Sequence, residues 1–258
     1  MTEPLPESIP APVAPTEPVF LRDRQGHTMR GCFVTGTDTE IGKTSISAAL
    51  LHWCTQQGWR SAGLKPVAAG VDSRGVNEDV RALRDASSLL LSHAEVGPLQ
   101  FRAACAPQIA AALEGHTIDS QTLVDHAQAL ADRADVLVVE GVGGFCVPLG
   151  PDFDTADLAQ ALHLPVVLVV GLRLGCINHA LLTAEAIRAR GLSLAGWVAN
   201  TLDPGMEHIS GNLDTLRHEF MRRYQAPCLG LVPRLPAPSP AAVAAYLDAE
   251  ALRTVFTL

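Results

Sequence analysis

The chain has 258 residues, a formal net charge of −8, and 48% hydrophobic but only 5% aromatic residues. A single domain is expected, because two ordinary domains joined by a linker need a longer chain. The negative charge leaves no basic surface for a nucleic acid backbone or an anionic membrane, so both classes are excluded as main partners.

The cysteine pattern and the lengths of the apolar runs indicate the cellular compartment of the protein. The six cysteines are scattered and lack the paired spacing of a zinc site or a redox motif. No run reaches the roughly 20 apolar residues needed to span a bilayer, and the acidic, Pro-rich start lacks the parts of a secretory signal. We therefore expect a cytoplasmic protein with reduced thiols.

Proline dominates the first segment. Residues 1–28 contain a proline every two to four residues as far as Pro18, which removes backbone donors and disfavours helix. We expect this segment to be a disordered or polyproline-like extension without an assigned role, and residues 29–258 to form the domain.

Buried strands alternating with helices are expected from residue 30 onward. GCFVTG (31–36) predicts a strand, and a Gly-rich turn leads to KTSISAALLHWCTQQG (43–58), whose apolar residues recur at helical spacing and which Gly58 can end. Similar apolar runs predict strands at 61–66, 135–141, 164–171, 194–200 and 227–233. Runs of this kind predict an α/β domain in which a mostly parallel sheet is covered by helices on both faces.

The segment GTDTEIGKT (36–44) has the parts of a phosphate-binding loop. Its glycines let backbone N–H groups turn inward, Lys43 can meet the β and γ phosphates, and the Thr44 hydroxyl can bind magnesium. Gly36 and Gly42 are separated by five residues instead of the usual four, so the standard pattern is not strictly met. The alternative is a plain glycine turn between a strand and a helix.

Three further polar residues are candidates for the same site. Lys65 and Glu140 fall at or just after the ends of predicted strands, where ligands of parallel sheets bind. Lys65 can stabilise charge on a transferring phosphoryl group, and Glu140 can hold a hydrated magnesium ion. Asp79, in GVNEDVRAL, is either a metal ligand or only an acidic residue in the first turn of a helix.

Six motifs in the same order and separation closely resemble dethiobiotin synthetases. They are GTDTEIGKT, GLKPVAAG, NEDV, VEGVGG, LRLGCINHALLTAEAI and GWVAN, and the resemblance runs from about Arg30 to about Leu235. It implies a P-loop NTPase-like homodimer that uses ATP and Mg²⁺ to join CO2 to 7,8-diaminononanoate. The products would be dethiobiotin, ADP and phosphate, formed through a carbamate and its mixed anhydride with phosphate.

The resemblance also implies roles for single residues. Lys43 and Lys65 would be catalytic and neutralise the phosphates and the carbamate, while Thr44, Asp79 and Glu140 would hold Mg²⁺. Asn200 and the GLVPRL segment would recognise adenine. The residues implied for the nucleotide and its metal are Gly36, Thr37, Asp38, Thr39, Glu40, Ile41, Gly42, Lys43, Thr44, Asp79, Glu140, Asn200, Pro233 and Leu235.

The substrate residues include the start of a predicted helix. LGCINHA (174–180) follows a strand, so its exposed N–H groups suit a carboxylate, and the resemblance implies that it reaches the substrate across the dimer interface. Asn178 alone would be a plausible N-cap. Residues 107–111 are expected in the substrate groove. The implied substrate set is Lys65, Ala69, Gly141, Gly143, Gly144, Gly175, Cys176, Ile177 and Asn178. Ala69 replaces a Ser or Thr that is frequent in the family.

Two other readings compete. ATP-dependent amidation of cobyrinic-type acids needs a glutamine-hydrolysing domain, for which the chain has no room. A dimeric ATPase switch of the partitioning type carries an additional Lys four residues before the second glycine, and Asp38 occupies that position here. The lack of a basic or amphipathic tail also disfavours the switch.

Overall fold

The computed structural model describes residues 20–23 and 25–256. Its main sheet has six strands, all parallel, in the order β2-β5-β1-β6-β7-β8. All of them lie where buried apolar runs were predicted. Their bounds are β1 (Gly31–Gly36), β2 (Ser61–Leu64), β5 (Val136–Glu140), β6 (Val166–Leu172), β7 (Leu194–Thr201) and β8 (Cys228–Val232).

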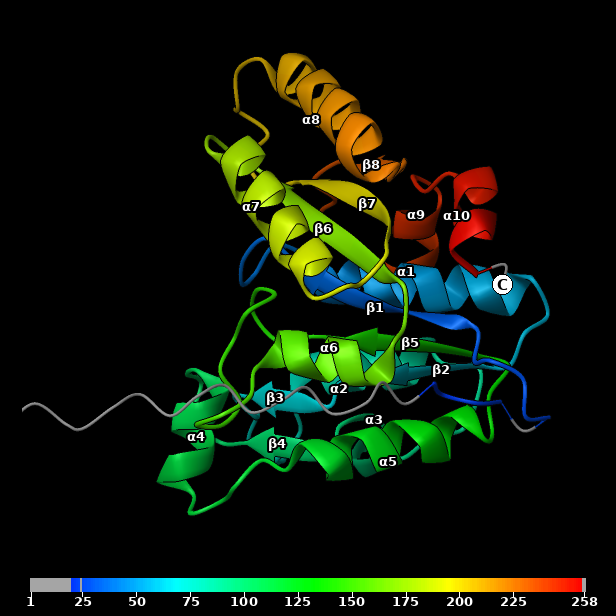
Figure 1. Ribbon diagram of the computed structural model, residues 1–258, viewed down its shortest axis with the longest axis vertical. Helices are drawn as coiled ribbons and strands as arrows, with labels where there is room; N and C mark the ends of the chain where they lie inside the picture. The colour runs from blue at the N-terminus through cyan, green and yellow to red at the C-terminus, as the bar shows by residue number, and fades with distance from the viewer. Residues whose placement is uncertain (1–19, 24, 257–258) are drawn as a thin grey trace, which may run out of the picture.

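Helices cover both faces of this sheet, as predicted (Figure 1). Helix α1 packs on β1, β2 and β5 together with α2, α9 and α10, whereas α5 to α8 lie over the other face. The bounds are α1 (Lys43–Gln56), α2 (Glu78–Ala86), α3 (His93–Val96), α4 (Pro107–Leu113), α5 (Ser120–Ala131), α6 (Thr155–Leu162), α7 (Cys176–Ala189), α8 (Ile209–Tyr224), α9 (Pro240–Ala244) and α10 (Ala249–Phe256).

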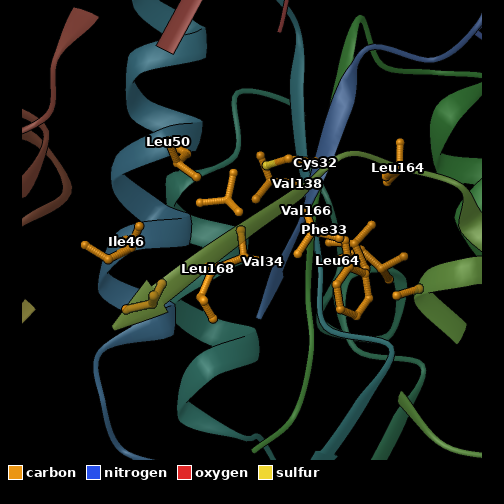
Figure 2. Close-up of a cluster of buried hydrophobic side chains, with 14 of the residues drawn as sticks. Cys32, Phe33, Val34, Ile46, Leu50, Leu64, Val138, Leu164, Val166 and Leu168 are labelled. Atoms are coloured by element: carbon orange, nitrogen blue, oxygen red, sulfur yellow. The ribbon is translucent and has the colours of Figure 1, made fainter. Parts of the chain in front are cut away.

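The core explains why the central strands read as continuous apolar runs. Every residue of β1, β5 and β6 is buried, because helices cover the sheet on both sides. Figure 2 shows side chains of α1, such as Ile46 and Leu50, packed against those of β1 and β6. This packing fixes the start of α1 at the carboxyl end of β1, where the phosphate loop lies.

A second, smaller sheet was not predicted. Strands β3 (Val67–Ala69) and β4 (Leu99–Phe101) pair in parallel, whereas the sequence was read as a loop after Pro66. Each strand has only three residues, too few for a periodic pattern to stand out. The pair matters for the site, because it carries Ala69 beside the cleft.

Much of the expected N-terminal extension lies outside the described residues. Residues 1–19 and 24 are not described, so their predicted disorder is untested. Leu21 is 2% exposed and belongs to the core, and Arg22 forms an antiparallel bridge with Thr28. The chain thus joins the packed domain before residue 29. Within the described residues, no helix is both long and apolar enough to cross a bilayer.

Candidate active site

A large cleft opens where the central strands end. Its volume is about 1330 Å³, and its wall includes the phosphate loop, Lys65, Asp79 and Glu140. These residues come from segments far apart in the sequence, and the parallel topology brings them to one edge of the sheet. The predicted convergence at the strand ends is therefore confirmed for the phosphate loop, Lys65 and Glu140, whereas Asn200 does not line the cleft.

The phosphate loop connects β1 to α1 through a left-handed turn. Gly42, the N-cap of α1, has φ 92°, and a Cβ atom there would lie 2.3 Å from Asn200 Nδ2. Glu40 also has a positive φ of 56°, a conformation that costs energy for a residue with a side chain. The loop is thus held in a curved path that leads into the N-terminus of α1, which is the arrangement that binds phosphate.

Thr44, Asp79 and Glu140 converge from three elements. Thr44 Oγ1 lies 2.7 Å from Asp79 Oδ1 and 2.8 Å from Glu140 Oε1. The single hydroxyl hydrogen of Thr44 can serve only one of these carboxylates at a time. The three oxygens therefore need a cation between or beside them to offset their mutual repulsion.

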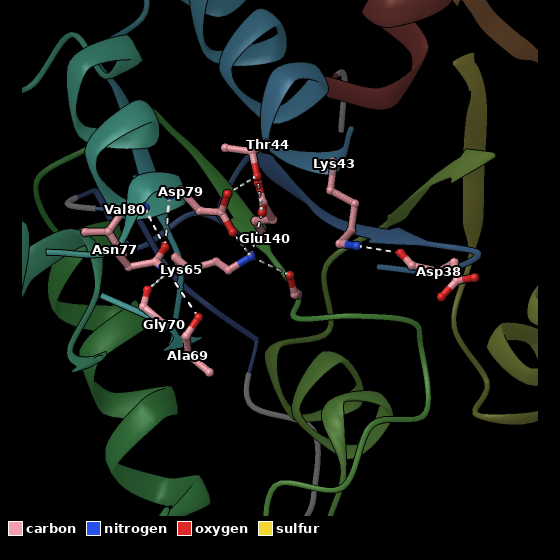
Figure 3. A network of polar contacts seen from close by, with 11 residues as sticks. Asp38, Lys43, Thr44, Lys65, Ala69, Gly70, Asn77, Asp79, Val80 and Glu140 are labelled. Atoms are coloured by element: carbon pink, nitrogen blue, oxygen red, sulfur yellow. Dashed lines mark hydrogen bonds and ion pairs between the residues drawn. The ribbon is translucent and has the colours of Figure 1, made fainter. Parts of the chain in front are cut away.

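Lys65 supplies a cation to both carboxylates. Its Nζ lies 2.6 Å from Glu140 Oε1 and 3.0 Å from Asp79 Oδ2, and it donates to the Gly141 carbonyl at 3.1 Å (Figure 3). Burial favours the neutral amine, but the carboxylates outweigh burial and raise the pKa of Lys65 above its ordinary value. Burial likewise opposes ionisation of Asp79, yet Lys65 holds the pKa of Asp79 below its ordinary value. Lys65 and Asp79 are therefore both charged near neutral pH.

The charge of Lys43 is less compensated than that of Lys65. It is 6% exposed, and its Nζ donates to the Asp38 backbone carbonyl at 2.8 Å. Burial, and then the charge of Lys65, lower the pKa of Lys43 to about 8. An anion entering the cleft would offset both effects, so the site favours a phosphate group beside these lysines.

The oxygens at this point fit a hard divalent cation. Glu140 is fully buried, and its Oε2 has no hydrogen-bond partner among the described residues. Carboxylates with a hydroxyl are the oxygen donors that Mg²⁺ takes, with substrate phosphates and water completing its shell. The donor set of Thr44, Asp79 and Glu140 thus satisfies the chemistry expected of a magnesium site.

The rest of the cleft wall combines predicted and unpredicted residues. Ala69, Gly143, Gly144 and Pro107 line it, as expected, whereas Gly141 is buried and does not. Residues 145–147 also line it and were not predicted. Thr155 fixes this segment, because its hydroxyl donates to the Phe145 carbonyl and accepts from the Val147 N–H. The sequence carries no signal for these residues, because Thr155 reaches residues 145–147 only through packing across the loop. The methyl group of Ala69 offers no hydrogen bond, and its carbonyl accepts one from Asn77 at 3.3 Å.

Several predicted nucleotide residues lie beside the cleft and do not line it. Asn200, at the end of β7, donates to the Ile41 carbonyl at 2.7 Å and so braces the phosphate loop. Pro233 and Leu235 follow β8 and are half-buried. Among the described residues of that region, Pro238 and Pro240 line the cleft.

The segment before α7 corrects one expectation. The N-cap of α7 is Gly175, with φ 93°, and Asn178 lies inside the first turn. The possible capping role of Asn178 is therefore wrong. Gly175, Cys176, Ile177 and Asn178 start the helix, as predicted, but are not among the residues that line the cleft.

Known proteins resemble this chain in sequence and in fold. A family model described as an AAA domain matches residues 30–242. The ATP-dependent dethiobiotin synthetase BioD of Janthinobacterium sp. (strain Marseille) is 53% identical over 228 residues, which cover 86% of this chain and 95% of that protein.

Solved structures extend the comparison to the fold. The MinC:MinD cell division protein complex of Aquifex aeolicus matches with a TM-score of 0.51 and 13% identity, over 87% of this chain and 94% of that chain. The MinD cell division protein of the same organism gives a TM-score of 0.49 and 12% identity, over 87% and 95%. At this identity the MinC:MinD match supports the fold alone.

The contacts of the two lysines predict that removing Lys65 destabilises the protein much more than removing Lys43. Lys65→Met should lower the free energy of unfolding by about 3–5 kcal/mol, because it leaves the buried Glu140 carboxylate without its cation. Millimolar Mg²⁺ should then raise the melting temperature of this variant more than that of the wild type. The measurements are chemical denaturation and thermal melts with MgCl2 or a chelator.

The matched control is Lys43→Met, which removes a buried lysine that pairs with a backbone carbonyl and is repelled by Lys65. It should cost much less stability and gain nothing extra from Mg²⁺. Equal losses in the two variants, or an equal response to Mg²⁺, would contradict the assigned charge pairing.

Proposed function

The chain belongs to the family of ATP-dependent dethiobiotin synthetases, and on this basis we propose that it converts 7,8-diaminononanoate, CO2 and ATP into dethiobiotin, ADP and phosphate. The observation that carries the proposal is the 53% identity to a dethiobiotin synthetase over 95% of that protein. The cluster of the buried Lys43, Lys65 and Glu140 with the half-buried Asp79 supplies a site of suitable chemistry.

The reaction divides into three bond-forming steps. One amine of the substrate attacks CO2 and loses a proton, which gives a carbamate. A carbamate oxygen then takes the γ-phosphoryl group, and the bond to ADP breaks. The second amine attacks the carbonyl carbon of this anhydride, closes the ureido ring and expels phosphate. Each amine is itself the nucleophile, so positioning and charge stabilisation are the main demands on the protein.

The two lysines meet the charge demand. Lys43 would contact the phosphates from the start of α1, where the N–H groups of the helix also point. Lys65 would stabilise charge on the transferring group and on the carbamate oxygens. Its buried position between two carboxylates keeps it protonated for that role.

Thr44, Asp79 and Glu140 would hold Mg²⁺. The ion supplies neutralisation of charge on the phosphate oxygens. Glu140 would offer its unpartnered Oε2, and Asp79 and Thr44 would add the neighbouring oxygens. Residues 36–42 would wrap the phosphates, and Asn200, Pro233 and Leu235 would lie near the adenine, beyond the phosphate loop.

The substrate would lie against Ala69, Gly141, Gly143 and Gly144. We propose that Gly175–Asn178 complete this site from the second subunit of a homodimer, since in their own subunit they do not line the cleft. The exposed Leu174 and Leu182, at 94% and 61%, lie beside this segment and offer apolar area for such a contact.

A partitioning-type switch is the less favoured alternative. Asp38 stands where such a switch carries its additional Lys, and its carboxylate pairs with Arg173 of the same chain. A carboxylate cannot supply the positive charge and the donors of that lysine, which disfavours the switch.

The direct test is phosphate release from ATP with Mg²⁺ and bicarbonate, with and without 7,8-diaminononanoate, while mass spectrometry follows the ureido product. We expect phosphate release that depends on the diamine and is matched by dethiobiotin. ATP hydrolysis that ignores the diamine would favour the switch.

The proposed shared site predicts complementation between two inactive variants. Lys43→Ala disables the cleft and Asn178→Asp places a negative charge at the proposed carboxylate site, so each alone should be inactive. A mixed dimer keeps one intact site, and co-expression should restore about one quarter of the wild-type activity. The absence of recovery in a purified mixed dimer would show that each subunit completes its own site.

A further inference from the structure

Asn77 joins two parts of the site that the sequence separates. It is 8% exposed and forms the N-cap of α2, where its Oδ1 accepts from the N–H groups of Asp79 at 2.9 Å and Val80 at 3.3 Å. Its Nδ2 donates in the opposite direction, to the carbonyls of Gly70 at 2.7 Å and Ala69 at 3.3 Å (Figure 3). One amide therefore spans the gap between the end of β3 and the start of α2.

The backbone of Asn77 adds a third connection. Its N–H donates to Gln100 Oε1 at 2.9 Å, and Gln100 lies on β4, the partner strand of β3. The covalent link from Gly70 to Asn77 runs through residues 71–76, of which 72–75 are exposed. The short and buried route between the two parts of the site is therefore the Asn77 side chain.

The two groups it connects have different roles in the proposed reaction. Asp79 Oδ1 and Oδ2 contact Thr44 and Lys65 at the proposed metal. Ala69 lines the cleft on the substrate side. A displacement of the Gly70 carbonyl would move Asn77, and through its cap would move the first turn of α2 with Asp79.

We propose that Asn77 is a positioning residue that couples the magnesium ligand Asp79 to the substrate wall at Ala69–Gly70. This inference rests on the proposed function, which assigns the metal and the substrate to these two groups. It predicts that Mg²⁺-dependent nucleotide binding and diamine binding depend on the same amide.

A plain helix cap would need only half of these contacts. Asp119, the N-cap of α5, accepts from the N–H and hydroxyl of Thr122 and needs no donor of its own. At position 77 the carboxamide adds an N–H₂ group, which Asp or Ser cannot supply. The hydrogen bonds that Asn77 Nδ2 donates are thus needed for the proposed coupling but not for capping the helix.

Two variants remove the donor and keep the cap. Asn77→Asp preserves shape but sets a carboxylate oxygen against two carbonyls, and Asn77→Ser caps without reaching them. In both, we expect the Mg²⁺ concentration for half-maximal binding of a non-hydrolysable ATP analogue, measured by calorimetry, to rise about tenfold, and the KM for 7,8-diaminononanoate to rise with it. Only Asn77→Asp adds a charge, so the same effect in both variants would show that the loss of the N–H₂ donor is the cause.

Asp119→Ala is the matched control, since it removes an N-cap remote from the cleft. It should lower the melting temperature while Mg²⁺ dependence and KM stay at wild-type values. If the two Asn77 variants keep the wild-type Mg²⁺ dependence and KM, as this control should, Asn77 only caps its helix and the coupling is wrong. A wild-type chain that makes no dethiobiotin would instead contradict the proposed function, and the Mg²⁺ titration of analogue binding would still test whether Asn77 positions Asp79.

Discussion

The ammonium group of Lys65, buried between Glu140 and Asp79, is the interaction on which the site depends. Glu140 is fully buried, and a lone buried carboxylate would be protonated or would destabilise the fold. Lys65 sets a positive charge against both acids, at the point proposed to hold the metal. The same contacts keep Lys65 protonated, so one pairing would supply both the oxygens for the proposed metal and a cation for the transferring phosphoryl group.

The parallel sheet makes this pairing possible. Lys65 follows β2 and Glu140 ends β5, and these strands are neighbours in the sheet. Strand β1 is the other neighbour of β5, and α1, which carries Thr44, starts just after β1. The residues are far apart in the chain, but the crossovers between parallel strands bring their strand ends to a common edge. Asn77 then joins the smaller β3–β4 sheet to α2, which carries Asp79.

The sequence predicted the parts of the molecule that rest on local patterns. Long apolar runs marked each strand of the main sheet, and the phosphate loop identified Lys43 and Thr44. Asp79 was ambiguous, because an acidic residue in the first turn of a helix is common whatever its function. The strands β3 and β4 and the double role of Asn77 left no local signal, since they arise from contacts between distant segments. Asn178 was misread as a possible cap because the left-handed turn at Gly175 begins the helix earlier.

The proposed reaction has this cluster stabilise the transfer of the γ-phosphoryl group of ATP to a carbamate oxygen. The most direct measurement is the fate of oxygen-18 from labelled bicarbonate, followed in phosphate and dethiobiotin by mass spectrometry before the label exchanges with water. Transfer to the carbamate predicts one labelled oxygen in the phosphate that is released with each dethiobiotin. Unlabelled phosphate, with the label confined to the ureido carbonyl, would show that ATP is cleaved without forming the anhydride and would contradict the account.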